Sequence, residues 1–423
     1  MPNWIAKPHL VLPFLLVVIL KEVSLLDNGF VSPAMGWNTW NKYGCSINEQ
    51  IILKAAEAIK NHGLDKLGYN CTIDDCWQAP QRGPNNVPLA DPKKFPKGIK
   101  ALADEIHDMG LKVGIYSDAG TYTCGKRYGS LGHEKVDAQT YANWGIDYLK
   151  YDNCYNEGLS GTPQISATRY RAMRDALNAT GRPIVYSLCQ WGEDAVWNWG
   201  WTIANSWRIS GDIYDHFDRP DDRCPCKDSV SYCALAGFQC SAMNILEKAA
   251  GVGQKAGSGG WNDLDMLEVG NGGMSYDEYV AHFSMWAFAK SPLILGNDVT
   301  NMSKETLSII SNKEIIALNQ DKSFDSGYRV WKMEDPRKSS GSIQLWKTSL
   351  VNGSYALAFL NATPKKLDYM VSLADFFFDD VSVFLNTFSM RQTCSSSSTT
   401  TSLPKSQKTG RSKIFGMLVG QYM

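Results

Sequence analysis

The chain has 423 residues, of which 44% are hydrophobic and 11% aromatic, so it can bury a large core and is too long for one small domain. Its 42 Lys and Arg residues balance 43 Asp and Glu residues, and the formal net charge is -1. This balance gives no electrostatic footprint for nucleic acid or for an anionic membrane surface, and we expect neither as a partner.

The N-terminal segment resembles a targeting sequence. Residues 10–20, LVLPFLLVVIL, form an apolar run after Lys7. The run is too short to span a bilayer but is typical of a signal-peptide core, and an uncleaved anchor is the alternative. We predict a signal peptide over residues 1–26 and a secreted protein. Five Asn-x-Ser/Thr sequons agree with a secretory route, at Asn70, Asn178, Asn301, Asn352 and Asn361.

From residue 27 to 318, short apolar runs alternate with segments of helical periodicity. In one of these segments Ile99, Leu102 and Ile106 fall on one helical face, and Gly110 supplies a C-terminal cap. This alternation predicts repeated βα units around a parallel sheet.

The other elements of this region follow the same reasoning. Ser46 and Glu49 are spaced as a capping box, which predicts a helix that starts there and stops at Gly63. The predicted strands lie at 33–38, 67–77, 111–119, 145–154, 184–189, 202–210, 260–267 and 291–298. Eight strands predict the α/β architecture of a (β/α)8 TIM barrel.

The pattern changes after the barrel region. Residues 319–390 contain short alternating runs separated by turn residues, which predict a smaller antiparallel β domain. Residues 391–423 include eight consecutive Ser or Thr residues, five basic residues and no acidic one. We predict a divergent, disordered tail there.

Several predicted strands end in polar or reactive side chains, and in a barrel such positions face the active site. These residues are Asp74, Asp75, Tyr116, Lys150, Asp152, Cys189, Trp191, Arg208 and Asp212. Alternation with period two places Lys150 and Asp152 on the same face of their strand. Because a neighbouring cation favours the ionised carboxylate, we expect the pKa of Asp152 to be lowered, which suits a nucleophile.

A second carboxylate could supply an acid. Asp212 follows a different strand and could face Asp152 across the barrel mouth, and two carboxylates in opposite protonation states can cleave a glycoside. Trp37, Trp191 and Trp261 lie near strand ends, where aromatic faces can pack on a sugar. Taken singly, these Asp residues could be helix caps and the tryptophans could be core residues.

Metal sites are the alternative for two groups of residues. Asp74 and Asp75 could bind a metal, but no His pair with ligand spacing lies nearby. A cluster of four cysteines could bind zinc or form two disulfides, and in an exported chain we favour disulfides. The cluster consists of Cys224, Cys226, Cys233 and Cys240.

The chain contains, in this order, the motifs MGWNTWNKYGC, IDDCWQ, GIYSDAG, YLKYDNC, SLCQWG, SWRISGDI and GGWNDLDML. Taken together, these motifs resemble the α-galactosidases of glycoside hydrolase family 27, in their plant and fungal form, over roughly residues 30 to 360. It implies a barrel followed by an antiparallel β-sandwich, and a retaining double displacement without metal or cofactor. The implied substrates are terminal α-galactosides of oligosaccharides or galactomannans, and a homo-oligomer is possible.

The resemblance also implies residue roles. Asp152 corresponds to the nucleophile and Asp212 to the acid/base. The residues implied to bind substrate are Trp37, Asp74, Asp75, Tyr116, Lys150, Cys189, Trp191, Arg208, Trp261, Asp265 and Met266. The implied disulfides are Cys45–Cys76, Cys124–Cys154, Cys224–Cys240 and Cys226–Cys233, which leave Cys71, Cys189 and Cys394.

The motifs also bear on specificity and on activity. The Cys189 and Trp191 side chains would crowd the sugar 2-position and disfavour N-acetylgalactosamine. Three features depart from the family: the strand around Asn70 is one residue shorter, Leu264 replaces a usual proline, and the sequence from about Met390 no longer resembles the closing strands of the β domain. A sugar-binding pseudoenzyme and an α-N-acetylgalactosaminidase are the alternative functions.

Overall fold

A computed structural model gives the fold of the chain. It describes residues 28–219, 224, 238–323, 325–334, 341–363, 384–389 and 413–420. The predicted signal peptide lies outside these residues. Within the described part of the chain, no helix is both long enough and apolar enough to cross a membrane.

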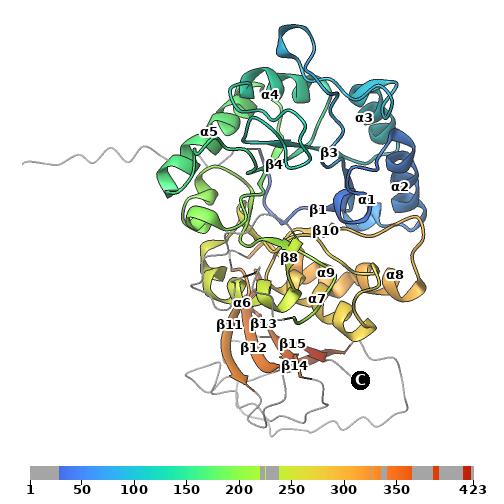
Figure 1. Cartoon of the computed structure of the whole chain (residues 1–423). Coiled ribbons are helices and arrows are strands. Elements are labelled where there is room, and N and C mark those ends of the chain that lie inside the picture. The colour runs from blue at the N-terminus through green and yellow to red at the C-terminus, as the bar shows by residue number, and fades with distance from the viewer. Residues whose placement is uncertain are drawn as a thin grey trace, which may run out of the picture.

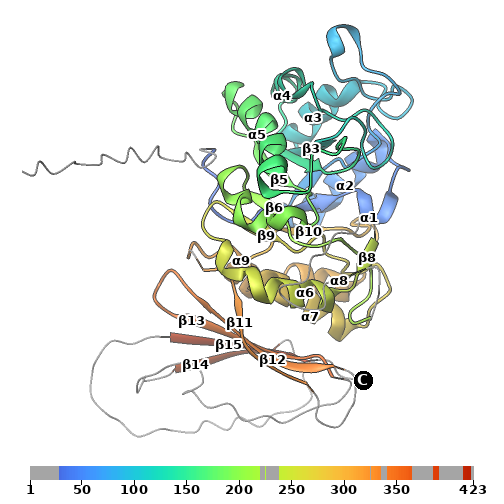
Figure 2. The same cartoon turned by 60° about the vertical axis from the view of Figure 1, so that its left-hand side comes forward.

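The larger domain is built on eight parallel strands (Figures 1 and 2). They are β1 (Met35–Asn38), β2 (Asn70–Thr72), β3 (Val113–Asp118), β4 (Tyr148–Asp152), β5 (Val185–Leu188), β6 (Ser206–Arg208), β9 (Trp261–Asp263) and β10 (Leu293–Leu295). Their order is β10-β1-β2-β3-β4-β5-β6-β9. The ring closes after β9, where Leu267 N–H donates to the Ile294 carbonyl at 2.7 Å and Gly296 N–H donates to the Leu267 carbonyl at 2.9 Å. The predicted (β/α)8 barrel is confirmed.

Helices cover the outside of the barrel (Figure 1). They are α2 (Glu49–Asn61), α3 (Gly98–Asp108), α4 (Glu134–Asn143), α5 (Pro163–Ala179), α6 (Ala242–Val252), α7 (Tyr276–Phe288), α8 (Lys304–Ile310) and α9 (Lys313–Gln320). The short helix α1 (Trp40–Tyr43) lies instead after the carboxyl end of β1. The predicted face of α3 is buried, and Gly110 follows this helix with a φ of 78°. The predicted capping box of α2 is wrong, because Asn48 is the N-cap and its side chain accepts a hydrogen bond from Ile51 N–H.

The C-terminal domain is a five-stranded sheet that lies against α6 and α7 (Figure 2). As predicted, β11 (Tyr328–Glu334), β12 (Ser342–Ser349) and β13 (Tyr355–Asn361) are antiparallel. The other two strands, β14 (Phe384–Ser389) and β15 (Lys413–Gly420), pair in parallel, so the whole sheet is mixed. Since β15 lies in the segment that we predicted to be disordered, the structure does not agree with that prediction for residues 413–420.

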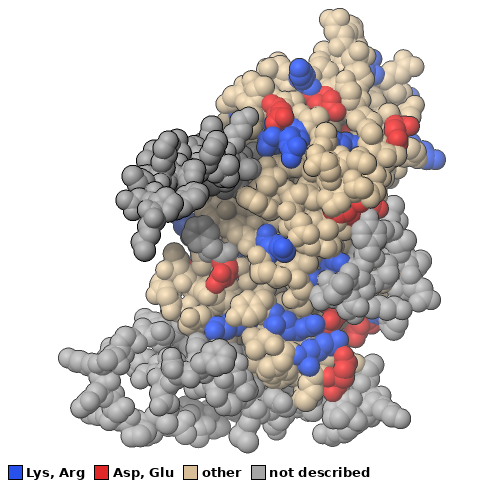
Figure 3. Space-filling model, turned by 90° about the vertical axis from the view of Figure 1, so that its left-hand side faces the viewer, with Lys and Arg blue, Asp and Glu red and all other residues tan. Residues whose placement is uncertain are grey.

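The surface carries both signs of charge. On the face shown in Figure 3, Lys and Arg side chains lie among Asp and Glu side chains on a mainly uncharged surface. Near the contact between the domains, Arg329 and Lys332 of β11 form ion pairs with Glu247 of α6 at 2.8 and 3.0 Å. These pairs join the sheet to the barrel.

Candidate active site

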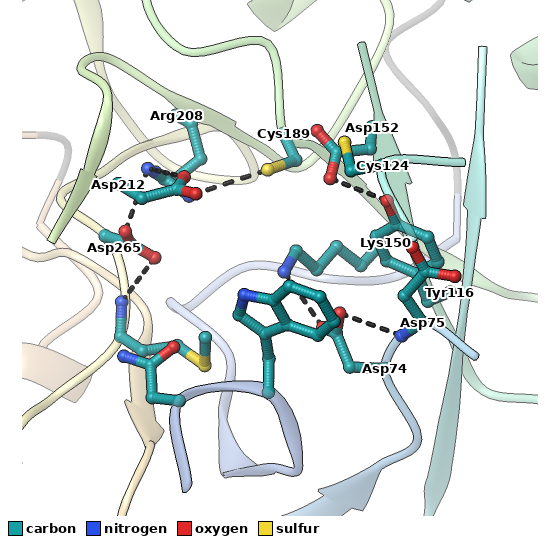
Figure 4. A pocket seen from close by; sticks show the side chains of 13 residues that line it. Asp74, Asp75, Tyr116, Cys124, Lys150, Asp152, Cys189, Arg208, Asp212 and Asp265 are labelled. Atoms are coloured by element: carbon teal, nitrogen blue, oxygen red, sulfur yellow. Dashed lines mark hydrogen bonds and ion pairs between the residues drawn. The ribbon is translucent and has the colours of Figure 1, made fainter. Parts of the chain in front are cut away.

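A pocket opens at the carboxyl ends of the barrel strands (Figure 4). Its lining residues are Trp40, Asn41, Asp74, Asp75, Tyr116, Cys124, Lys150, Asp152, Cys189, Arg208, Asp212, Asp265 and Met266. The structure thus brings together all the predicted site residues except the three tryptophans Trp37, Trp191 and Trp261.

Asp152 is the last residue of β4 and its side chain is buried. Tyr116 O–H donates to Asp152 Oδ2 at 2.8 Å, and Asn153 N–H donates to Oδ1 at 2.9 Å. Burial raises the pKa of Asp152 to about 7, although Lys150 and Tyr116 act in the opposite direction, and the negative charge of Asp212 adds to the rise. The expected lowering of the pKa is therefore wrong, because the loss of hydration outweighs the nearby cation.

The second carboxylate is held by a buried guanidinium. Asp212 begins β7 (Asp212–Ile213), a short strand outside the barrel that pairs with β8 (Phe238–Cys240). Arg208, at the end of β6, lies 2.8 Å from Asp212 Oδ1 and 2.8 Å from Asp265 Oδ2. Figure 4 shows Asp212 and Asp152 on opposite sides of the pocket. Burial raises the pKa of Asp265 to about 6 despite its contact with Arg208.

Two adjacent carboxylates follow β2. Lys150 Nζ lies 2.9 Å from Asp74 Oδ2, while Asp75 accepts hydrogen bonds from Gly125 N–H at 2.7 Å and from Cys76 N–H at 2.6 Å. The shortened strand therefore keeps both side chains in the pocket, each with hydrogen-bonding partners. Burial raises the pKa of Asp75, because it removes water from the carboxylate. The backbone donors partly oppose this effect by binding the ionised form.

The tryptophan predictions need correction. Trp37 and Trp261 have no exposed surface, and their indole N–H groups donate to the carbonyls of Asn297 and Val31 at 2.8 and 3.1 Å. Trp191 is also buried and does not line the pocket. The aromatic wall is Trp40 instead.

The end of β1 is what separates Trp40 from Trp37. Trp37 lies within β1, whereas Trp40 begins α1, two residues after the end of that strand, and so lies on the catalytic face. Asn38 connects this helix to the carboxylates, because its side chain accepts from Trp40 N–H at 2.8 Å and donates to Asp74 Oδ2 at 2.6 Å. The sequence reasoning assigned no role to Asn38.

Asn153 follows the end of β4 beside Asp152 and also received no role from the sequence. Its side chain accepts a hydrogen bond from Arg169 and donates to Glu193 Oε2 at 2.9 Å. Arg169 is buried and also donates to the Leu159 and Ala119 carbonyls at 2.9 and 3.1 Å. These contacts hold the backbone at the end of β4 in place and thereby orient Asp152.

The structure contains three of the four disulfides that the resemblance implies. They are Cys45–Cys76, Cys124–Cys154 and Cys224–Cys240, and the pair Cys226–Cys233 lies outside the described residues. Cys71 and Cys189 are free and buried. Burial raises the pKa of the Cys189 thiol well above its ordinary value, so this pocket residue is a neutral thiol.

Among the described residues, one group of potential metal ligands lies close together: Asp118, Cys124 and Cys154. The two cysteines are joined in a disulfide, and a metal would bind a thiolate rather than a disulfide sulfur. Cys224 and Cys240 of the four-cysteine cluster are also joined to each other, as favoured over zinc. These groups therefore do not form a metal centre in this arrangement.

Leu264 occupies the position where the resembling family usually has proline. Its backbone N–H donates to Ser291 Oγ at 3.0 Å, a bond that proline could not make, and its side chain has no exposed surface. The following residues stay in place, since Asp265 accepts hydrogen bonds from Ile213 N–H at 2.7 Å and from Met266 N–H at 2.8 Å. The substitution is therefore accommodated beside the pocket.

The mouth of the closed (β/α)8 barrel holds two opposed carboxylates and several further polar side chains. This arrangement defines the class of glycoside hydrolases. The comparisons with known proteins give the family. The family model described as Alpha galactosidase A matches residues 32–321.

Individual relatives agree with the family model. The α-galactosidase mel1 of Schizosaccharomyces pombe is 55% identical over 368 residues, which are 86% of this chain and 84% of that protein. The crystal structure of α-galactosidase I from Mortierella vinacea matches with a TM-score of 0.75 and 60% identity, over 79% of this chain and 83% of that one. A structure of α-galactosidase from Saccharomyces cerevisiae with raffinose has a TM-score of 0.80 and 49% identity, over 82% and 78%. The chain belongs to the α-galactosidase family of glycoside hydrolases.

Proposed function

We propose that the chain is a retaining α-galactosidase in which Asp152 is the nucleophile and Asp212 is the general acid and then the base. The observation that carries the proposal is the position of the two carboxylates, which face one another across the pocket from different elements. Each has its own donor, Tyr116 for Asp152 and Arg208 for Asp212. The proposed reaction needs only these protein side chains and water.

In the first step, a carboxylate oxygen of Asp152 attacks the anomeric carbon while Asp212 gives its proton to the glycosidic oxygen. The bond between the anomeric carbon and that oxygen breaks, and the aglycone leaves as an alcohol. A galactosyl ester on Asp152 remains.

In the second step, Asp212 takes a proton from water, and the resulting hydroxide oxygen attacks the anomeric carbon of the ester. The ester bond breaks and Asp152 leaves as a carboxylate. Because the anomeric carbon is inverted twice, the product keeps the α configuration.

The environment of Asp152 decides whether the nucleophile is ionised. Burial and the charge of Asp212 raise the pKa of Asp152 to about 7, whereas the proposed first step needs Asp152 as a carboxylate. Lys150 and Tyr116 oppose the rise and so favour the form in which Asp152 is ionised.

The remaining pocket residues would hold the galactose. We expect Asp74 and Asp75 to accept hydrogen bonds from its 4- and 6-hydroxyl groups, Lys150 to contact O3 or O4, and Arg208 to contact O2 or O3. The neutral thiol of Cys189 lines the wall beside Arg208, at 3.5 Å from one of its nitrogens. Charged groups that are already positioned lose little entropy when they bind hydroxyl groups, which favours productive orientation of the sugar.

The choice between galactose and N-acetylgalactosamine depends on the wall near Arg208. Of the two residues that we expect to crowd the 2-position, Cys189 lines the pocket and Trp191 does not. Both carboxylates are present and have partners, which favours an enzyme over a sugar-binding pseudoenzyme. The activity on the two sugars tests the choice.

Secretion is also part of the proposal. The apolar run at residues 10–20 and the sequons support it, together with three disulfides, which persist in an oxidising compartment. Recovery of the protein from culture medium without residues 1–26 would agree with secretion, whereas retention of these residues on a cell-associated protein would contradict it.

The first experiment compares release of nitrophenol from 4-nitrophenyl α-galactoside and from 4-nitrophenyl α-N-acetylgalactosaminide, with and without a chelator. We expect the wild type to hydrolyse the galactoside, to prefer it, and to be unaffected by the chelator. Asp152→Asn should lose nearly all turnover, with Asp175→Asn as a control because Asp175 has a side chain 62% exposed on α5. A folded wild type that leaves the galactoside intact would refute the proposal.

The second experiment separates the two carboxylate roles by rescue with azide. If Asp152 is the nucleophile, azide added to Asp152→Gly takes the place of the missing carboxylate, attacks the substrate and gives β-galactosyl azide. If Asp212 is the acid/base, azide added to Asp212→Gly attacks the galactosyl ester and gives α-galactosyl azide. The opposite pair of products would reverse the assignment.

A further inference from the structure

Two exposed tyrosines lie together near the active-site pocket. Tyr122 is 54% exposed and Tyr155 is 46% exposed, and their ring centroids are 5.8 Å apart with planes at 76°. Neither phenol has a hydrogen-bond partner among the described residues, and the catalytic mechanism uses neither side chain. Together they form an apolar surface with two hydroxyl groups, which we call the tyrosine pair.

The tyrosine pair is connected to the pocket by a disulfide. Tyr122 precedes Cys124 by two residues and Tyr155 directly follows Cys154, and these cysteines are bonded to each other. Cys124 also lines the pocket. The two rings are thus carried by the loops after β3 and β4, on the face of the barrel where the pocket opens.

The two loops are also fixed to one another by hydrogen bonds. Thr121 N–H donates to the Tyr155 carbonyl at 3.1 Å, and the Thr121 hydroxyl donates to Glu157 Oε1 at 2.7 Å. Gly120 permits this close approach, since a Cβ there would lie 1.9 Å from the Cys154 carbonyl oxygen. The rings are therefore organised before any ligand arrives, which lowers the entropy cost of binding.

Tyr155 has an unusual backbone conformation. Its φ is 43°, in the left-handed region that an aromatic side chain seldom adopts. Such strain persists only where the surrounding structure imposes it, and it occurs often at functional sites. Here the disulfide and the hydrogen bonds to Thr121 impose it, and the ring is held at the surface beside Tyr122 instead of in the core.

We propose that the tyrosine pair is a subsite for the aglycone, where the sugar units that bear the galactose pack on the rings. This inference rests on the proposed α-galactosidase activity and adds the residues that contact the sugar units next to the galactose. Aromatic rings pack against the C–H face of a pyranose, and the free phenol groups can bond its hydroxyls. The galactose fills the pocket below.

The experiment measures kcat/KM for two substrates with the same galactosyl group. Raffinose carries a disaccharide aglycone, which the proposed subsite would contact, whereas α-galactosyl fluoride carries no aglycone sugar. We expect Tyr122→Ala to lower the ratio of kcat/KM for raffinose to that for the fluoride about tenfold, which corresponds to about 1.4 kcal/mol. Tyr122→Phe, which keeps the ring face, should retain most of the ratio.

Tyr328→Ala is the matched control, because this tyrosine is 41% exposed on β11 in the other domain and should leave the ratio unchanged. A ratio that stays at the wild-type value in Tyr122→Ala would overturn the subsite while leaving the proposed function intact. A folded wild type that hydrolyses neither substrate would overturn the proposed function and the subsite with it. Tyr122 is the preferred position, since replacement of Tyr155 could shift the adjacent disulfide.

Discussion

The hydrogen bond from Tyr116 to Asp152 should set the acid limit of catalysis. Asp152 must be ionised to attack the sugar, and burial has already raised its pKa to about 7. The Tyr116 hydroxyl, 2.8 Å from Asp152 Oδ2, donates to the carboxylate and so opposes that rise. Tyr116→Phe removes only this hydroxyl, and the pKa of Asp152 should therefore increase further.

The size of the effect follows from the kind of bond. A hydrogen bond to a charged group contributes about 1.5–3 kcal/mol, and one pKa unit corresponds to about 1.4 kcal/mol. We expect the acid limb of the pH profile of kcat/KM, which reports the free enzyme, to move about 1–2 pH units higher in Tyr116→Phe. Activity at high pH should fall much less than activity at low pH.

The assay is the pH dependence of kcat/KM on 4-nitrophenyl α-galactoside for the wild type and two variants. Tyr170→Phe is the matched control, because the Tyr170 hydroxyl donates to the main-chain carbonyl of Asp152 at 3.1 Å and leaves the carboxylate untouched. Its acid limb should stay close to that of the wild type. An unmoved limb in Tyr116→Phe, or equal movement in both variants, would refute the reasoning.

Three further predictions concern the pocket and its support. Trp40→Ala should lower kcat/KM about tenfold or more with little loss of stability, whereas Trp37→Ala should cost about 3–5 kcal/mol of unfolding free energy because its ring is fully buried. Arg208→Lys keeps the charge but loses the planar guanidinium, whose Nη2 contacts both Asp212 and Asp265, so kcat/KM should fall about 10- to 100-fold. Burial raises the pKa of Glu268 from 4.5 to about 8, so its contribution to stability is complete below pH 4.5 and is lost as the pH rises through 8. The melting temperature should therefore fall less between pH 5 and pH 8 in Glu268→Gln than in the wild type.

Each of these predictions has a contrary result. Equal effects of Trp40→Ala and Trp37→Ala on kcat/KM and on urea unfolding would contradict the assignment of Trp40 to the pocket wall and of Trp37 to the core. Wild-type kinetics in Arg208→Lys would mean that charge alone suffices at that position. An identical decline in melting temperature for wild type and Glu268→Gln would show that Glu268 does not titrate in this range.

The sequence by itself determined the barrel and most of the pocket. Apolar runs that alternate with helical segments give parallel strands, and alternation with period two places Lys150 and Asp152 side by side at the end of β4. Because all eight strands run in the same direction, residues at their carboxyl ends meet at one mouth. Asp74, Tyr116 and Arg208 could therefore be assigned to the pocket without any knowledge of distances.

Only the tertiary structure decided which of two nearby side chains faces the pocket and what charge it carries. Trp37 and Trp40 are alike in sequence, but the first packs into the core and the second lines the wall, because β1 ends between them. Likewise, the pKa of Asp152 depends on how completely the fold removes water from it, and local sequence shows the cation but not the burial. Strand pairing over long separations, as between β13 and β15, depends on chain closure that no local pattern encodes.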